Sequence, residues 1–169
     1  MQQAAMTMAE ETAADWWEVE ALYDLCFAPG RSALSSYRLR DGVAPIAPLC
    51  ITARDENGVL AGAVRNWPVC IDGSLVVLLG PIAVHPTRQG EGVAAMLMRQ
   101  CLAVAAQHGW DRIMLVGDAP YYQRFGFAKL NGVEMPPPTN PDRVLGLALR
   151  DGAWDGVVGV VTQATDCKS

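Results

Sequence analysis

The sequence has no long apolar run: no stretch approaches the roughly 20 residues that a helix needs to cross a bilayer. Residues 1–10 also lack the basic segment followed by an apolar one that is typical of a secretory signal peptide. These two absences predict a cytoplasmic protein that does not bind membranes. The chain of 169 residues fits one domain over residues 1–169, and its 51% hydrophobic and 18% charged residues are typical of a globular protein.

Histidine is scarce, with two in the chain, and the five cysteines are odd in number and widely spaced. No two cysteines form a CxxC pair, which predicts neither a zinc site nor a disulfide framework, so we expect no metal. Cys101 lies in an apolar helical pattern, which favours a small core residue over a nucleophile. The cysteines stand at Cys26, Cys50, Cys70, Cys101 and Cys167.

Positive charge is in deficit, because 13 lysines and arginines face 18 aspartates and glutamates, for a formal net charge of −5. A surface of this sign repels phosphate backbones, so we expect no nucleic-acid partner. It does not exclude a small anionic cofactor, since backbone amides hold phosphate without net positive charge. A cationic amine substrate would suit the acidic surface.

Apolar periodicity and turn residues predict helices and hairpin-linked strands. Apolar residues at three- and four-residue spacing indicate helices, while Asn57-Gly58 and Asp72-Gly73 are dipeptides typical of tight hairpin turns. This order predicts an α/β fold with a mixed sheet covered by helices. The predicted elements are helices over 16–27, 32–39, 92–108 and 120–125, and strands over 49–54, 59–67, 75–84, 112–116, 127–130, 144–149 and 157–161.

The most apolar predicted strand, 75–84, is interrupted by Gly80-Pro81. A strand that is apolar on both faces belongs near the centre of a sheet. Proline cannot donate a hydrogen bond to a neighbouring strand, so the sequence predicts a bulge or a splayed strand at this point.

A glycine-containing turn, Gln89-Gly90-Glu91-Gly92-Val93-Ala94, follows this strand at the start of the next helix. A helix start offers unpaired N–H groups and the positive end of the helix dipole. Glycines let the backbone approach an anion without a side chain in the way. The turn therefore predicts a pyrophosphate cradle, with a plain strand-to-helix turn as the alternative.

The same turn formally fits a second motif, since Gly90-x-Gly92-x-x-Ala95 matches the dinucleotide fingerprint of Rossmann domains. In that motif the first glycine follows its strand almost directly, and an acidic residue ends the next strand. Asp118 does end the next predicted strand here. However, hairpin-linked strands precede the turn, whereas a dinucleotide domain repeats strand–helix units, so the order of elements disfavours this alternative.

Together these motifs resemble the GNAT superfamily of acetyl-CoA-dependent N-acetyltransferases. The family signature, [Gln/Arg]-x-x-Gly-x-[Gly/Ala], is met at every defined position by the turn from Gln89 to Ala94. Leu79-Gly80-Pro81-Ile82-Ala83-Val84 is similar to the family's splayed fourth strand, and Tyr122-Gln123-Arg124-Phe125-Gly126-Phe127 to its late Tyr-x-x-x-Gly-Phe element. The segment from Leu79 to Phe127 looks most like a bacterial subgroup, the YhbS-like predicted acetyltransferases, with a weaker likeness at Tyr37-Arg38-Leu39-Arg40.

The resemblance implies a mixed, mostly antiparallel central sheet flanked by helices, with a splayed central strand pair at the cofactor site. It implies direct transfer from acetyl-CoA, as cosubstrate, to a small-molecule or protein amine in a ternary complex. A monomer and a homodimer both stay open. Arg88 would add a charge contact to the phosphates. The implied cofactor-binding residues are Ile82, Ala83 and Val84 for pantetheine and thioester, and Gln89, Gly90, Glu91, Gly92, Val93 and Ala94 for the phosphates.

Tyr122 matches the tyrosine that family members place near the sulfur as general acid. A phenol with a pKa of about 10 stays protonated at neutral pH and can donate a proton to a departing thiolate. The structural alternative is a tyrosine that packs against the sheet edge. Tyr121 is the second candidate for the acid.

The resemblance assigns neither the general base nor the acceptor. Asp118, Asp72, His85 and Glu134 are all candidates for the base. Because the base is unassigned, a non-catalytic acyl-CoA sensor or regulatory module on the same fold is the alternative function.

Overall fold

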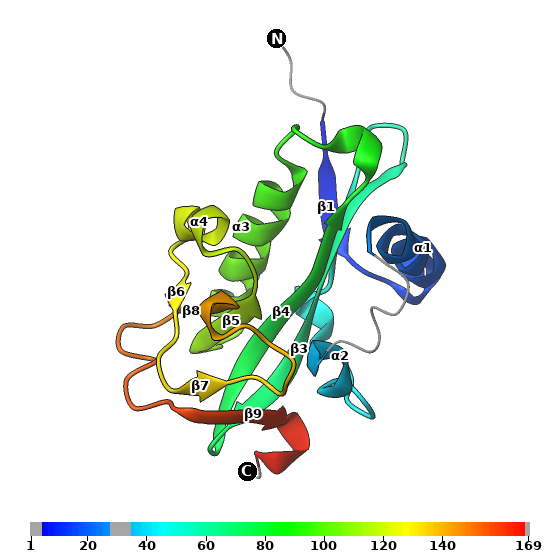
Figure 1. Cartoon of the computed structure of the whole chain (residues 1–169). Helices are drawn as coiled ribbons and strands as arrows, with labels where there is room; N and C mark the ends of the chain where they lie inside the picture. Colours follow the sequence, from blue (N-terminus) through cyan, green and yellow to red (C-terminus); the bar gives the residue numbers. More distant parts are fainter. Residues whose placement is uncertain (1–4, 28–34, 168–169) are drawn as a thin grey trace.

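The computed structural model describes residues 5–27 and 35–167, which form a nine-stranded sheet with helices on both faces (Figure 1). The strand order is β1-β2-β3-β4-β5-β8-β6, with β9 beside β3 and β7 beside β9. Among the described strands, β4–β5 and β7–β9 are the parallel pairs. The helices are α1 (Trp16–Cys26), α2 (Ser35–Arg38), α3 (Val93–Gln107) and α4 (Ala119–Tyr122), and the strands are β1 (Thr7–Glu10), β2 (Ile51–Arg54), β3 (Leu60–Ile71), β4 (Ser74–Val84), β5 (Arg112–Val116), β6 (Ala128–Lys129), β7 (Val133–Glu134), β8 (Val144–Ala148) and β9 (Gly159–Gln163).

Helices α1 and α3 cover opposite faces of the sheet, as Figure 1 shows. On α3, buried residues recur every four positions, at Val93, Leu97, Cys101 and Ala105, so one stripe of the helix packs on the sheet. The predicted core position of Cys101 is confirmed, and burial raises the pKa of its thiol to about 12. In the described part of the chain, no helix is long and apolar enough to cross a membrane.

Strand β4 lies in the middle of the sheet, as its apolar sequence predicts. Its pairing with β3 changes register at Gly80-Pro81: Val64 lies opposite Ile82, and Asn66 lies opposite Leu79. Two residues of β4 therefore oppose one residue of β3, which is a β-bulge. The bulge predicted from the proline is confirmed.

Strands β1 and β7 are the two described strands that the sequence patterns did not predict. Strand β1 is mostly exposed, so its sequence, Thr-Met-Ala-Glu, lacks the apolar alternation of a half-buried strand. Pairing with β2, which places Thr7 opposite Arg54, defines it instead. Strand β7 has two residues and depends on its parallel partner β9. Part of the predicted helix over 32–39 lies outside the described residues.

A disulfide joins Cys70 on β3 to Cys167 after β9, so the expectation of no disulfide is wrong for this pair. The two cysteines are 97 residues apart in sequence, and their Cα atoms lie 5.5 Å apart. They meet because β9 pairs with the end of β3, where Cys70 lies opposite Thr162. Cysteine spacing alone does not reveal such a long-range contact. The remaining cysteines, Cys26, Cys50 and Cys101, are free.

Replacing Cys167 with serine is expected to lower the free energy of unfolding by about 2 to 4 kcal/mol, because the cross-link closes a long loop and restricts the unfolded chain. Denaturant unfolding with and without reductant measures this effect. Reductant should bring the wild type to the stability of the variant and leave the variant unchanged. Cys26→Ser is the control, because Cys26 is a free thiol. Equal stability of the wild type in both conditions would contradict a stabilising cross-link.

Candidate active site

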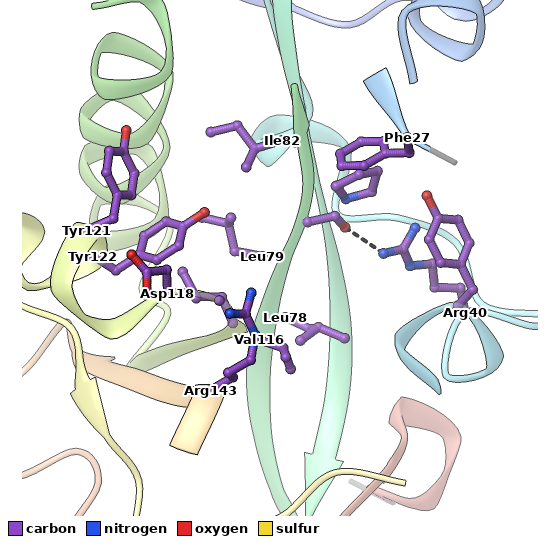
Figure 2. Close-up of a pocket in the computed structure, with 15 residues that line it drawn as sticks. Phe27, Arg40, Leu78, Leu79, Ile82, Val116, Asp118, Tyr121, Tyr122 and Arg143 are labelled. Carbon is purple, nitrogen blue, oxygen red and sulfur yellow. Dashed lines mark hydrogen bonds between the residues drawn. The ribbon is translucent and has the colours of Figure 1, made fainter. Parts of the chain in front are cut away.

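A cavity of about 570 Å³ opens where β4 and β5 diverge. The two strands pair only at Val77–Ile113 and Leu78–Met114, so the later part of β4 has no partner on its β5 side among the described strands. The cavity walls come from the β4 bulge, from the end of β5 with α4, and from the segment around α2. These walls include Ile82, Asp118, Tyr122 and Arg40, which Figure 2 labels, and the lining also includes Pro81 and, before β8, Arg143.

Side chains from α1 and from the segment after α2 hold the β4 bulge in place. The Tyr23 hydroxyl donates to the carbonyl oxygen of Pro81 at 3.0 Å, and Nη2 of Arg40 donates to that of Gly80 at 2.9 Å. A bulge leaves ladder groups without a strand partner, and buried carbonyls need donors. These two bonds therefore stabilise the splayed geometry.

The backbone N–H groups of the three residues after the bulge, Ile82, Ala83 and Val84, do not all face the gap between β4 and β5. The His85 N–H donates to the carbonyl oxygen of Ala61 on β3 at 2.8 Å. Backbone groups alternate in direction along an antiparallel strand, so the Ala83 N–H also faces β3. The N–H groups of Ile82 and Val84 consequently face the open side. Of the three amides predicted to contact pantetheine, these two have the required direction.

The glycine turn forms the N-terminus of α3. Gly92 is the N-cap residue with φ of 80°, a left-handed conformation that favours glycine. A Cβ atom at Gly92 would have no heavy atom within 4 Å, so the space beside it is open. Gln89 fixes the preceding loop by donating from Nε2 to the carbonyl oxygen of Val84 at 3.0 Å. The turn thus presents the first-turn amides of α3 to an open surface.

Arg88, predicted to add a charge contact, is instead paired with two carboxylates. Its guanidinium lies 2.9 Å from the Asp55 carboxylate and 3.0 Å from that of Glu91. These two negative charges offset its positive charge. In this arrangement the amides of the turn, rather than Arg88, are the groups available to an anion.

Tyr122 is half-buried, and Figure 2 shows its hydroxyl directed across the cavity toward β4. Gly117 makes this position possible, because a Cβ atom there would lie 2.5 Å from Cε2 of the Tyr122 ring. Burial, with smaller contributions from Tyr121 and Asp118, raises the pKa of the Tyr122 phenol above its ordinary value, and the positive charge of Arg143 offsets part of this shift. A protonated phenol at neutral pH suits a general acid. Tyr121 also lines the cavity, but Figure 2 shows its hydroxyl in a different direction from that of Tyr122.

The four candidate bases lie in different parts of the molecule. Asp118 lines the cavity at the start of α4. His85 uses Nδ1 to accept from the Thr87 N–H at 3.2 Å, which caps a short turn. Asp72 lies in the β3–β4 hairpin and Glu134 on β7, and neither lines this cavity. Geometry favours Asp118 among the four.

Arg40 and Arg143 line the cavity, although the sequence motifs predicted a role for neither. Arg40 lies in the Tyr37–Arg40 segment, where only a weak family likeness marked it, and Arg143 precedes β8. With Asp118 as the acidic residue of the lining, the cavity carries one positive charge in excess in a chain of net charge −5. The positive charge of the lining does not favour a cationic substrate, in contrast to the expectation from the acidic net charge of the chain.

No metal site accompanies the cavity in the described residues: nowhere in 5–27 and 35–167 do three histidine, cysteine, aspartate or glutamate side chains gather as ligands.

Comparison with known proteins gives a consistent match. Residues 5–127 match the model of the Acetyltransferase (GNAT) family. The N-acetyltransferase YhbS of Escherichia coli (strain K12) is 30% identical over 117 residues, which cover 67% of this chain and 70% of that relative.

Two solved structures extend the match to the whole fold. The structure of Escherichia coli YhbS in complex with CoA has a TM-score of 0.83 at 26% identity, covering 96% of this chain and 92% of that one. A GNAT family acetyltransferase from Brucella melitensis in complex with acetyl-CoA has a TM-score of 0.73 at 26% identity, covering 94% and 96%. The fold predicted from the sequence is confirmed.

Proposed function

Because the chain belongs to the acetyltransferase (GNAT) family, we propose that it transfers an acetyl group from acetyl-CoA directly to an amine in a ternary complex. The observation that carries this proposal is the divergence of β4 from β5 beside Tyr122, together with the glycine turn that follows β4 at the start of α3. Two relatives of the same fold hold CoA and acetyl-CoA. We extend that cosubstrate to this chain.

Backbone amides bind both ends of the cosubstrate in this proposal. The open N–H groups of Ile82 and Val84 bind the pantetheine and thioester, while Ala83 stays in the β3 ladder. The amides from Gln89 to Ala94 bind the phosphates, because a helix N-terminus with glycines favours an anion. Neither interaction requires a net positive protein, which fits the charge of −5.

The chemical step moves one acetyl group and two protons. The amine nitrogen attacks the thioester carbon, and backbone N–H groups stabilise the negative charge that develops on the carbonyl oxygen. The carbon–sulfur bond then breaks, and the Tyr122 hydroxyl protonates the departing thiolate. Asp118, the candidate base that lines the cavity, accepts the proton that the amine loses. The products are an N-acetylated amine and free coenzyme A.

The acceptor in this proposal is a small-molecule or protein amine. Two further statements stay predictions from the sequence: a cytoplasmic location and a single domain over residues 1–169. A homodimer stays open.

Acetyl-CoA is expected to raise the melting temperature, whereas NADH at the same concentration is not. A ligand present at 100 times its Kd stabilises the native state by about 2.7 kcal/mol, or about 5 to 10 °C for a chain of this length. Thermal unfolding with each ligand measures the difference. A shift with NADH and none with acetyl-CoA would favour the dinucleotide alternative.

Release of free thiol with a panel of amines tests the activity itself. Thiol release that depends on an amine supports the transferase. Stabilisation by acetyl-CoA without thiol release from any amine would favour the acyl-CoA sensor instead.

A further inference from the structure

Arg40 presents a fixed guanidinium to the cavity from the segment after α2. Its Cζ lies 3.8 Å from the centroid of the Tyr37 ring and 5.3 Å from that of Trp67. Nη2 donates to the carbonyl oxygen of Gly80 at 2.9 Å. Stacking on one face and a hydrogen bond at one edge restrict the rotation of the group. Its position is therefore set before any ligand binds.

No carboxylate pairs with this guanidinium within residues 5–27 and 35–167. The other arginines that are substantially buried, Arg54, Arg65, Arg88 and Arg112, each have an acidic partner there. Nε of Arg40 is buried and has no hydrogen-bond partner. A partly buried cation without an anion is costly, and a bound carboxylate would offset that cost.

The position of Arg40 separates it from the expected phosphate site. The cavity lining includes Arg40 and Tyr122 but no residue from Gln89 to Ala94. Figure 2 shows Arg40 on one side of β4, with Tyr122 and Asp118 on the other. An anion at Arg40 would thus lie in the same cavity as the reacting groups and away from the glycine turn. It would belong to the acceptor rather than to the phosphates of coenzyme A.

We propose that Arg40 binds a carboxylate of the acceptor, so that the preferred substrates are small amines that also carry a carboxylate group. This inference rests on the proposed function, because it specifies the acceptor for the same cavity. The planar guanidinium matches carboxylate geometry and forms charge-assisted hydrogen bonds. Phe27, Leu78 and Pro81 add apolar surface to the lining, which suits an aliphatic or aromatic substrate body.

A purely structural role for Arg40 gives a different expectation. If Arg40 only clamps the bulge at Gly80, its loss would slow acetylation of every amine by the same factor. If it binds the acceptor, its loss would slow only amines with a carboxylate. The decisive quantity is therefore selectivity rather than activity.

The test compares kcat/KM for amino acids with kcat/KM for their primary amides, which have the same side chain but no carboxylate. The ratio of kcat/KM for the acid to kcat/KM for the amide should be about 10- to 100-fold higher in the wild type than in the Arg40→Met variant. This factor is the usual contribution of a hydrogen bond to a charged group. The ratio between the two proteins cancels the intrinsic difference in amine reactivity. Arg40→Lys keeps the charge and should retain part of the preference. Arg99→Met, an exposed position on α3, is the control and should keep all of it.

Calorimetric binding of the same pairs to protein loaded with coenzyme A distinguishes failure of this inference from failure of the proposed function. Binding of acids that weakens about 10- to 100-fold in Arg40→Met supports the carboxylate site even if no amine is acetylated. Turnover of amines with equal losses for acids and amides in Arg40→Met would overturn the inference and leave the transferase intact. Unchanged selectivity in a folded Arg40→Met variant would also overturn it.

Discussion

Replacing Tyr122 with phenylalanine is expected to lower kcat by about 100-fold, within the range of general acid catalysis. The substitution removes one hydroxyl and keeps the ring, which packs with its centroid 6.1 Å from that of Phe127. Stability and acetyl-CoA affinity should therefore change little. The measurement is kcat beside the Kd for acetyl-CoA, with an amine identified by thiol release. A kcat loss without a loss of affinity is the signature of an interaction made only in the transition state.

The pH dependence of kcat provides a second check on Tyr122. A general acid must be protonated, and the raised pKa of the buried phenol extends its protonated form to higher pH. The wild-type kcat should therefore show no fall caused by Tyr122 below about pH 10, the usual tyrosine pKa. A fall in kcat as the pH rises, with an apparent pKa below about 10, would have to arise from the titration of another group.

Tyr121→Phe is the matched control, since Tyr121 is its chain neighbour and their ring centroids are 4.9 Å apart. Its hydroxyl points in a different direction from that of Tyr122 (Figure 2), so the control should keep nearly full kcat. A 100-fold loss in Tyr121→Phe instead would move the role to that residue. Full kcat in Tyr122→Phe, with chemistry rate-limiting, would rule Tyr122 out as the acid.

Replacing Gly92 with glutamate is expected to weaken acetyl-CoA binding by about 100-fold or more. The new carboxylate would stand at the N-terminus of α3 beside the predicted phosphate position, and opposed like charges cost several kcal/mol. The open space around Gly92 accommodates the side chain. Isothermal titration with acetyl-CoA measures the loss, and the circular dichroism spectrum checks the fold.

Gly92→Gln separates charge from backbone strain in this experiment. Either side chain at a φ of 80° costs about 1 to 2 kcal/mol, so both variants should lose similar stability. Only Gly92→Glu adds a negative charge, so only this variant should lose most of its affinity for acetyl-CoA. Equal affinities in the two variants would indicate that the phosphates bind elsewhere.

Short-range features of the sequence were sufficient for α1, α3 and the two hairpins that join β2, β3 and β4. Apolar residues at four-residue spacing define α3, and Asp72-Gly73 joins β3 to β4, because both depend on contacts between near neighbours. The bulge at Gly80-Pro81 follows from a missing N–H group, which is a property of the residue itself. The glycine turn follows from a backbone conformation that other residues rarely adopt.

Only the tertiary structure decided which distant residues meet. The Cys70–Cys167 bond depends on β9 returning to β3, and β1 exists because β2 pairs with it. The placement of Arg40 in the cavity depends on packing that brings the segment after α2 to Gly80, 40 residues along the chain. Packing of the α4 region against the bulge of β4 likewise brings Asp118 and Tyr122 into the cavity lining together, whereas Asp72 lies in the β3–β4 hairpin outside that lining. Residue type limits what a side chain can do chemically, whereas its partners come from long-range contacts that local sequence patterns do not encode.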